Sequence, residues 1–302
     1  MGRLPGFFDL VRCRAVRLVT IVTVVWFGVV AVPPAQAADA VLAGAGDISD
    51  CTNGGDAATA ALLGSIGGTV ITLGDNAYAA GTGQQFSACY GPTWGRFKGR
   101  TRPAVGNHDY DTAGASGYFN YFRGAAGPKG KGWYSYNAGA WHVIVLNANC
   151  DKVGCAAGSE QERWLRADLA AHGNQCTLAY WHQARFVSDD THGNNGAVAP
   201  FWDALYQYGA DLVLSAHAHI YERFAPQTPA GKADPVRGIR EIVVGTGGES
   251  HYGLAAAKPN SQVRNASTFG VIKLGLHAGS YDWQFLPTGG TGFRDSGRGA
   301  CH

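Results

Sequence analysis

Short apolar runs recur along the chain between glycine-rich and polar segments, as expected for strands joined by helices and loops. Residues 41–46 and 69–74 are two such runs, and the small residues of 56–66 between them favour a helix. A strand, a helix and a second strand in this order predict a βαβ unit. Each of its two strands is followed by a carboxylate, Asp47 after the first and Asp75 after the second.

The same pattern predicts the rest of the fold. Further strand-like runs lie at 100–105, 132–137, 140–147, 177–182, 211–217, 239–244, 269–276 and 281–286. Helices are predicted in part of 84–99 and at 116–122, 159–172 and 199–208. No repeat, charge run or long linker divides the chain, so we expect one α/β domain with strands on both sides of a two-layered core. The tail from about residue 288 is rich in Gly and Arg, and we expect Cys301 to tie it down.

The first 37 residues have the composition of a secretory leader. Four arginines precede an uncharged apolar stretch of 15 residues at 18–32, and Ala35-Gln36-Ala37 offers small residues for cleavage. A membrane span needs about 20 residues, so cleavage near Ala37 is favoured over the alternative of an uncleaved anchor. We therefore predict a cleaved signal peptide at 1–37, a single catalytic domain at 38–302, secretion, and no stable membrane anchor.

Removing this leader changes the charge balance. Residues 1–37 hold 4 of the 24 Lys and Arg residues and 1 of the 22 Asp and Glu residues, so the other 265 residues carry 20 basic and 21 acidic side chains. A near-neutral chain gives no electrostatic reason to expect a nucleic-acid partner.

Six of the seven cysteines lie outside the leader. An even number of cysteines in an exported protein predicts three disulfides. Cys150 and Cys155 enclose only four residues and are predicted to pair with each other. The pairing among the other four cysteines is left open.

Side chains able to bind metal ions follow five of the predicted strands. They are Asp47, Asp75, Asn107, His108, His182, His217 and His219. Ligands collect at the carboxyl ends of strands in open α/β sheets, so we expect these side chains to lie together. Seven groups fit two neighbouring metal ions better than one, and their mixture of oxygen and imidazole donors suits Zn, Mn or Fe. Because alternate residues of an extended backbone point in opposite directions, His217 and His219 are expected to serve different ions.

Five sequence blocks, in this order, carry a family resemblance. They are Gly46-Asp47, Gly74-Asp75-Asn76-Ala77-Tyr78, Gly106-Asn107-His108-Asp109, Trp181-His182 and Ala216-His217-Ala218-His219. The chain resembles the calcineurin-like metallophosphoesterases, and the tyrosine three residues after the second aspartate makes it most similar to single-domain purple acid phosphatases. The resemblance implies a four-layer α+β fold, in which two packed mixed β-sheets are flanked by helices. It also implies a metal-dependent phosphoric ester hydrolase.

The resemblance further implies a role for each residue of these blocks. One ion, an Fe(III), would be held by Asp47, Asp75, Tyr78 and His219. A second, divalent ion (Fe, Zn or Mn) would be held by Asn107, His182 and His217, with Asp75 as the bridge. Asn107 and His108 would contact the substrate, with His108 as acid or electrostatic stabiliser and Asp109 fixing its tautomer. The nucleophile would be a metal-bound hydroxide.

Three assignments have a plain alternative. Tyr78 could simply pack over the site, because a phenol with a pKa of about 10 becomes a ligand only beside a strong Lewis acid. His192 and His251 lie on polar loops and could reach the substrate. For both histidines the alternative is a solvated loop position.

The leading hypothesis is an exported, acid phosphatase-like enzyme that hydrolyses small phosphate monoesters. A phosphodiesterase or nucleotidase of the same superfamily is the first alternative, because the metal ligands alone do not select between esters. A non-catalytic exported binding module is the second. The sequence names neither the natural ester nor the oligomeric state.

Overall fold

The computed structural model describes residues 39–173 and 176–302 of the chain. The described residues from Asp39 onward belong to one compact unit. The predicted leader and its cleavage site lie outside the described residues, so both stay predictions. None of the helices within the described ranges is long and apolar enough to cross a membrane.

The first of two β-sheets has six strands in the order β13-β12-β11-β1-β2-β3. Their bounds are β1 Ala40–Ala45, β2 Thr69–Leu73, β3 Thr101–Ala104, β11 Gly270–His277, β12 Ser280–Pro287 and β13 Ser296–Ala300. β1, β2 and β3 are parallel to one another, whereas β11, β12 and β13 pair antiparallel. The register pairs Ala45 with Thr72 and Thr72 with Pro103, so the three parallel strands end side by side.

The second sheet has seven strands in the order β10-β8-β9-β7-β6-β5-β4. Their bounds are β4 Tyr134–Ala138, β5 Trp141–Val145, β6 Cys176–Gln183, β7 Leu212–Ala216, β8 Tyr221–Phe224, β9 Arg240–Val244 and β10 Ser261–Asn265. Here β5, β6, β7 and β9 are parallel and the outer strands are antiparallel.

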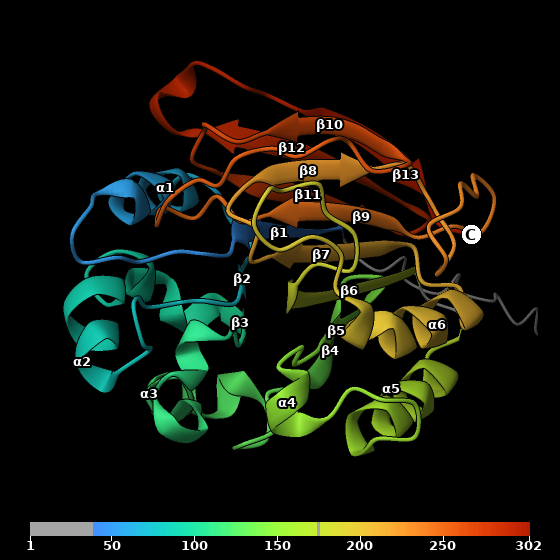
Figure 1. Ribbon diagram of the computed structural model, residues 1–302, viewed down its shortest axis with the longest axis horizontal. Coiled ribbons are helices and arrows are strands. Elements are labelled where there is room, and N and C mark those ends of the chain that lie inside the picture. The colour runs from blue at the N-terminus through green and yellow to red at the C-terminus, as the bar shows by residue number, and fades with distance from the viewer. Residues whose placement is uncertain (1–38, 174–175) are drawn as a thin grey trace, which may run out of the picture. The chain divides into compact units, whose positions relative to one another are not determined.

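The two sheets pack face to face, with helices outside them (Figure 1). The helices are α1 Gly55–Gly64, α2 Gly83–Gln85, α3 Ser116–Phe122, α4 Cys150–Val153, α5 Glu160–Ala171 and α6 Ala199–Gln207. Successive residues of a strand face opposite sides: along β5, Val143 and Val145 enter the core between the sheets, while Ile144 enters the core beneath α5 and α6. The predicted fold of two mixed sheets flanked by helices is confirmed.

Three strands, β8, β10 and β13, were not predicted from the sequence pattern. The tail from residue 288, expected only to be tied down by Cys301, contains β13 as an edge strand paired with β12. Its glycines are required by close packing, because a Cβ on Gly297 would lie 2.5 Å from the Trp283 ring and one on Gly299 would lie 2.4 Å from the Tyr281 ring. A strand built on glycine has no apolar alternation to reveal it.

The three predicted disulfides are present. Cys150 pairs with Cys155 as expected, and the open pairings are Cys51–Cys89 and Cys176–Cys301. The last of these joins the start of β6 to the residue after β13, so it fastens the C-terminal edge of the first sheet to the second sheet.

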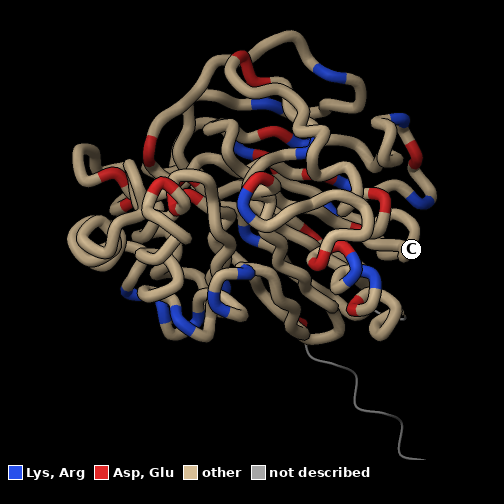
Figure 2. Tube along the Cα trace, turned by 60° about the horizontal axis from the view of Figure 1, so that its bottom comes forward, with Lys and Arg blue, Asp and Glu red and all other residues tan. Residues whose placement is uncertain are grey.

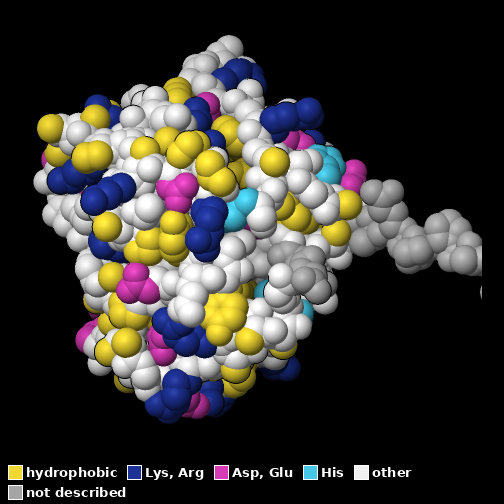
Figure 3. Space-filling model, turned by 90° about the vertical axis from the view of Figure 1, so that its right-hand side faces the viewer, with side chains coloured by type: hydrophobic (Ala, Val, Ile, Leu, Met, Phe, Trp, Pro, Cys, Tyr) yellow, Lys and Arg dark blue, Asp and Glu magenta, His cyan; other side chains and the backbone are white. Residues whose placement is uncertain are grey.

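Charged residues are distributed over much of the described chain (Figure 2). On the face seen in Figure 3, hydrophobic, basic and acidic side chains are interspersed.

Candidate metal centre

The predicted ligands meet where the loops after β1, β2 and β3 of the first sheet face the end of β6 and the loop after β7 of the second. Tyr78 lies at the centre of the first group. Its hydroxyl oxygen is 2.9 Å from Asp47 Oδ1, 3.0 Å from Asp75 Oδ2 and 3.1 Å from His219 Nε2. Both carboxylates are almost fully buried. The phenol oxygen therefore lies among the three other side chains that were assigned to the first ion.

A second group lies on the other side of Asp75. His182 Nε2 is 3.1 Å from Asp75 Oδ2 and 3.3 Å from His217 Nδ1. One ligand atom from each of Asp75, His182 and His217 lies within 4.8 Å of the others. The Asp75 carboxylate thus touches both groups, which is the position required of a bridging ligand.

Asn107 supplies an independent sign that this pocket is built for a cation. Its side-chain oxygen Oδ1 is buried and has no hydrogen-bond partner in the described structure. A buried polar atom without a partner costs about 1–3 kcal/mol, so such an atom at a candidate site requires an explanation. Hard amide and carboxylate oxygens beside imidazole nitrogens fit Fe, Zn or Mn, and the seven predicted ligands therefore fit two such ions.

Neighbouring groups fix which nitrogen of two histidines faces the centre. His182 Nδ1 is 2.7 Å from the carbonyl oxygen of Leu73, so that nitrogen donates and Nε2 is left to ligate. His219 Nδ1 is 2.8 Å from Ser250 Oγ and 3.0 Å from Glu249 Oε2, which again leaves Nε2 facing Tyr78 and Asp47. This supporting role of Glu249 and Ser250 could not be predicted from sequence, since they lie about 30 residues after the ligand.

Four of the ligands have backbone conformations that non-glycine residues rarely adopt. The φ angles are +57° at Asp47, +49° at Asp75, +72° at His217 and +48° at His219. The expectation that extended backbone separates His217 from His219 is therefore wrong. They do point to different groups, but because the left-handed turn around Ala218 directs them there. Strained backbone of this kind concentrates at functional sites.

Glycines allow the loops to approach this closely. A Cβ on Gly106 would lie 2.0 Å from Asp75 Oδ1 and 2.2 Å from the Asp75 backbone nitrogen. Gly74 has a φ of +91°, and a Cβ there would lie 2.6 Å from the His182 ring. Both positions exclude every other residue unless a ligand moves.

The charges of the two groups stabilise one another. Burial opposes the charge of Asp47, but His219 and His182 outweigh it and hold the pKa of Asp47 well below its usual range. Burial likewise opposes a charge on His182 and His219, but Asp75 and Asp47 raise the pKa of His182 to about 9, and Asp47 raises that of His219 to about 10. Burial and the neighbouring His182 lower the pKa of His217 to about 3.

The expected partnership of His108 and Asp109 is wrong. His108 Nδ1 is 2.7 Å from the Ala79 carbonyl oxygen, so a backbone group fixes its tautomer. Asp109 instead accepts hydrogen bonds from the Gly106 N–H at 2.9 Å and from Asn76 Nδ2 at 2.8 Å. Burial and the charge of Asp75 raise the pKa of Asp109 to about 7. The Asp109 side chain therefore joins the loops after β2 and β3. It is not the partner of the His108 side chain, although the two residues are neighbours in one 3-10 turn.

His192 lies beside the centre, and its predicted contact with substrate stays a prediction. Its ring centroid is 4.0 Å from that of His217, and Asp189 Oδ2 holds its Nδ1 at 2.9 Å. It lines a cavity of about 360 Å³ together with Gln183, Asn194 and His217. His251 is different: its Nδ1 is 3.2 Å from the His219 carbonyl oxygen and its ring stacks on Phe269. It packs behind a ligand, and the structure does not support its predicted contact with substrate.

One residue at the rim was missed from sequence. The Tyr252 ring stacks on His219, with centroids 4.1 Å apart and planes 15° apart, and lies 5.2 Å from the His192 ring. It follows a glycine-rich loop and belongs to no strand end, so the only available signal was an aromatic residue near His251.

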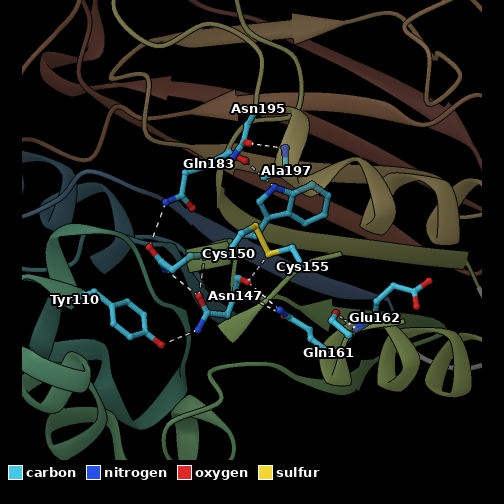
Figure 4. The surroundings of a disulfide bond; sticks show 12 residues. Tyr110, Asn147, Cys150, Cys155, Gln161, Glu162, Gln183, Asn195 and Ala197 are labelled. Carbon is cyan, nitrogen blue, oxygen red and sulfur yellow. Dashed lines mark hydrogen bonds between the residues drawn. A yellow bond between two sulfur atoms is a disulfide. The ribbon is translucent and has the colours of Figure 1, made fainter. Parts of the chain in front are cut away.

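The loop after β5 forms hydrogen bonds to Tyr110 and Gln183, which neighbour residues of the centre in sequence (Figure 4). Asn147 donates to the Tyr110 hydroxyl at 2.9 Å, and Gln161 Nε2 donates to the Asn147 carbonyl oxygen. Gln183, directly after the ligand His182, donates to Asn149 Oδ1 at 3.3 Å. The Cys150–Cys155 disulfide closes the turn that follows directly after Asn147 and Asn149.

Two other groups of ligand-type residues have structural explanations. His142 bonds to Asp168 at 2.6 Å and stacks on His172 at 3.8 Å, so it is a packed histidine. Cys176 and Cys301 lie near Asp211 but are joined in a disulfide.

The sequence profile of the calcineurin-like phosphoesterases matches residues 32–221, which is more than half of the chain. The chain belongs to this family. The family assignment made from the five sequence blocks is thereby confirmed.

Relatives within this family include purple acid phosphatases. The chain is 29% identical over 173 residues to purple acid phosphatase 15 of Arabidopsis thaliana, a match covering 51% of this chain and 32% of the relative. It is 31% identical over 200 residues to the uncharacterized protein Rv2577 of Mycobacterium tuberculosis, covering 53% of this chain and 38% of the relative. The match thus spans less than two fifths of the length of either relative.

Two solved structures have the same fold as this chain. The purple acid phosphatase PPD1 of yellow lupin (Lupinus luteus) superposes with a TM-score of 0.70 at 17% identity, covering 88% of this chain and 54% of PPD1. GAP50 of Plasmodium, described as the anchor in the inner membrane complex, superposes at 0.66 with 13% identity, covering 87% of this chain and 89% of GAP50. At these identities the similarity shows the fold alone.

Proposed function

We propose that this calcineurin-like phosphoesterase is an exported phosphatase that uses two metal ions to hydrolyse phosphate monoesters. The contact of the Tyr78 hydroxyl with Asp47, Asp75 and His219 carries the proposal. A phenol at that position is the feature that made the sequence resemble purple acid phosphatases, and relatives of that name support it.

The residues present fit both ions. Asp47, Asp75, Tyr78 and His219 would hold an Fe(III), and Asn107, His182 and His217, together with Asp75, would hold a divalent Fe, Zn or Mn. When bound, the two ions would supply Lewis-acid activation of water and stabilise charge on the phosphoryl group. The protein contributes a buried setting for them, in which each ligand is already oriented by a hydrogen bond or by a glycine-dependent turn.

Two histidines at the rim are placed to act on the ester. The Nδ1–H of His108 donates to the Ala79 carbonyl oxygen, so its Nε2, 3.9 Å from Asp75 Oδ2, is free and would donate a proton to a leaving oxygen when the ring is an imidazolium. The Nδ1–H of His192 donates to the Asp189 carboxylate, which leaves its Nε2 free to donate to a phosphoryl oxygen in the imidazolium form. His108 comes from the first-sheet side of the centre and His192 from the second-sheet side.

Export is part of the proposal. The leader-like composition of residues 1–37 supports it, and so do three disulfides, which persist in oxidising compartments.

Two alternatives use the same scaffold. A phosphodiesterase or nucleotidase would share every metal ligand. A non-catalytic exported module is the other alternative, and the similarity to GAP50, described as an anchor, shows that this fold also occurs in a protein with that description.

The test compares phosphate release from an aryl phosphate monoester and an aryl phosphate diester by protein reconstituted with Fe and Zn. We expect the wild-type protein to prefer the monoester, and Asp75→Asn to reduce its hydrolysis by at least about 1000-fold while circular dichroism shows the fold retained. A clear preference for the diester would favour the first alternative. Full activity of Asp75→Asn in metal-defined protein would contradict the proposal.

A further inference from the structure

Two loops on the second-sheet side of the centre are fastened to each other, residues 188–195 and 249–258. The Asp190 N–H donates to the Gly253 carbonyl oxygen at 3.2 Å, and the Gly253 N–H donates to Asp190 Oδ1 at 3.1 Å. The Ala255 N–H donates to the Ser188 carbonyl oxygen at 2.9 Å. These contacts fix the position of residue 252 relative to that of residue 192.

Because the loops are fastened, their aromatic side chains form a continuous wall beside the ligands. Tyr252 stacks on His219 at 4.1 Å and contacts His192 at 5.2 Å, and His192 contacts His217 at 4.0 Å. Each rim residue of this wall thus lies against a different ligand histidine. Tyr252 lies over His219, on the side where Tyr78 and Asp47 were assigned to the first ion.

The hydroxyl of Tyr252 differs from those of the other tyrosines nearby. Tyr78 bonds to two carboxylates and the Tyr110 hydroxyl accepts from Asn147, whereas the Tyr252 hydroxyl has no hydrogen-bond partner among residues 39–173 and 176–302. The side chain is only partly buried, so the hydroxyl is accessible. A phenol O–H can donate one hydrogen bond. It therefore presents a free O–H donor at a site proposed to receive a dianion.

We propose that Tyr252 binds the substrate, donating its hydroxyl hydrogen bond to a non-bridging oxygen of the phosphoryl group. The proposal rests on the proposed function, since it assigns a substrate contact at the same site. Stacking on His219 holds the ring, and the fastened loops hold the backbone, so the donor is positioned before the ester arrives. Preorganised donors of this kind stabilise charge without reorganisation.

The test measures binding of inorganic phosphate to the metal-loaded protein by calorimetry, beside steady-state kinetics with an aryl phosphate. Tyr252→Phe keeps the ring and removes only the hydroxyl, and it should weaken phosphate binding and lower kcat/KM about tenfold, with metal content unchanged. Tyr252→Ala should have at least that effect. The matched control is Tyr206→Phe, which removes a hydroxyl bonded to Asp234 near the end of α6 and should change neither quantity.

Phosphate affinity of Tyr252→Phe equal to wild type would overturn the proposal, even if Tyr252→Ala were weaker, because the ring alone would then account for the effect. Failure of the wild-type protein to bind phosphate would also overturn it. Phosphate binding without ester hydrolysis would remove the proposed function, yet the comparison of affinities would still decide the role of Tyr252.

Discussion

The two halves of the metal centre are chemically unlike. The first sheet supplies only oxygen ligands, from the loops after β1, β2 and β3. The second sheet supplies only nitrogen ligands, from the end of β6 and the loop after β7. The oxygen half holds two buried carboxylates and the nitrogen half holds imidazoles. Neither half is electrostatically satisfied by itself, since a buried charge requires a partner.

Contacts between the two halves supply the partners for these buried charges. Asp75 pairs with His182 at 3.1 Å, and Asp47 pairs with His219 at 3.3 Å. Both pairs form only when the sheets are packed together. The same charges that would bind the ions thus compensate one another across the interface, and the centre is a product of the whole fold rather than of one motif.

Among the variants that test this comparison of the two halves, the largest effect is expected from a glycine of the oxygen half. Gly106→Ala places a Cβ 2.0 Å from Asp75 Oδ1 and 2.2 Å from backbone, so the bridging carboxylate must move. We expect at least about 100-fold lower activity, reduced metal content, and a loss of about 1–3 kcal/mol in the free energy of unfolding measured by denaturant titration. The matched control is Gly99→Ala, where a Cβ meets no atom within 4 Å. Unchanged metal content and activity in Gly106→Ala would show that the Asp75 carboxylate can move without loss of the metal centre.

The pairing between halves predicts a pH effect that metal should remove. In metal-free protein the pKa of His182 is raised to about 9 and that of His219 to about 10. A raised pKa stabilises the fold fully below the unfolded value of about 6.5, and this contribution is lost as pH rises through the folded values. The melting temperature of chelated protein should therefore fall between about pH 6.5 and 10.

Metal-loaded protein is the control for this titration. Ligated imidazoles are neutral, so its melting temperature should lack the same decline, and the gap between loaded and chelated protein should widen with rising pH. Parallel profiles for the two forms would show that the histidines do not exchange protons for metal.

Sequence periodicity predicted much of this arrangement because the ligands follow buried strands, whose apolar runs are easily recognised. Asp47, Asp75, His182 and His217 could be placed together on that basis. The hydrogen-bond partner of His108 could not be predicted, because it is a backbone carbonyl oxygen from another loop. Tyr252 was also missed, since its position depends on hydrogen bonds between two irregular loops. β13 was missed because ring packing, not alternation, selects its residues.

The smallest effect is expected from the tethers of the two rim histidines. Asp189 holds His192 through its ring and its backbone N–H, both at 2.9 Å. Asp189→Asn should raise KM for an aryl phosphate about three- to tenfold with little change in metal content, because an NH2 group replaces one of the two oxygens that accept from His192 and Gly193, and the negative charge is lost. His108 depends on a backbone carbonyl, and the exposed Asp111, 3.4 Å from its Nδ1, is the matched control. Asp111→Asn should change KM less than twofold, and an equal effect of the two variants would contradict this difference between the halves.

The central claim is that both halves together bind two ions, one of them in contact with Tyr78. Metal analysis combined with a visible spectrum tests it most directly, using wild-type protein and Tyr78→Phe after reconstitution with Fe and Zn. We predict about two ions per wild-type chain and a visible tyrosinate–Fe(III) band that Tyr78→Phe removes. Fewer than about one ion per chain would contradict the two-metal centre, and an active, colourless Fe-loaded protein would contradict the role of Tyr78.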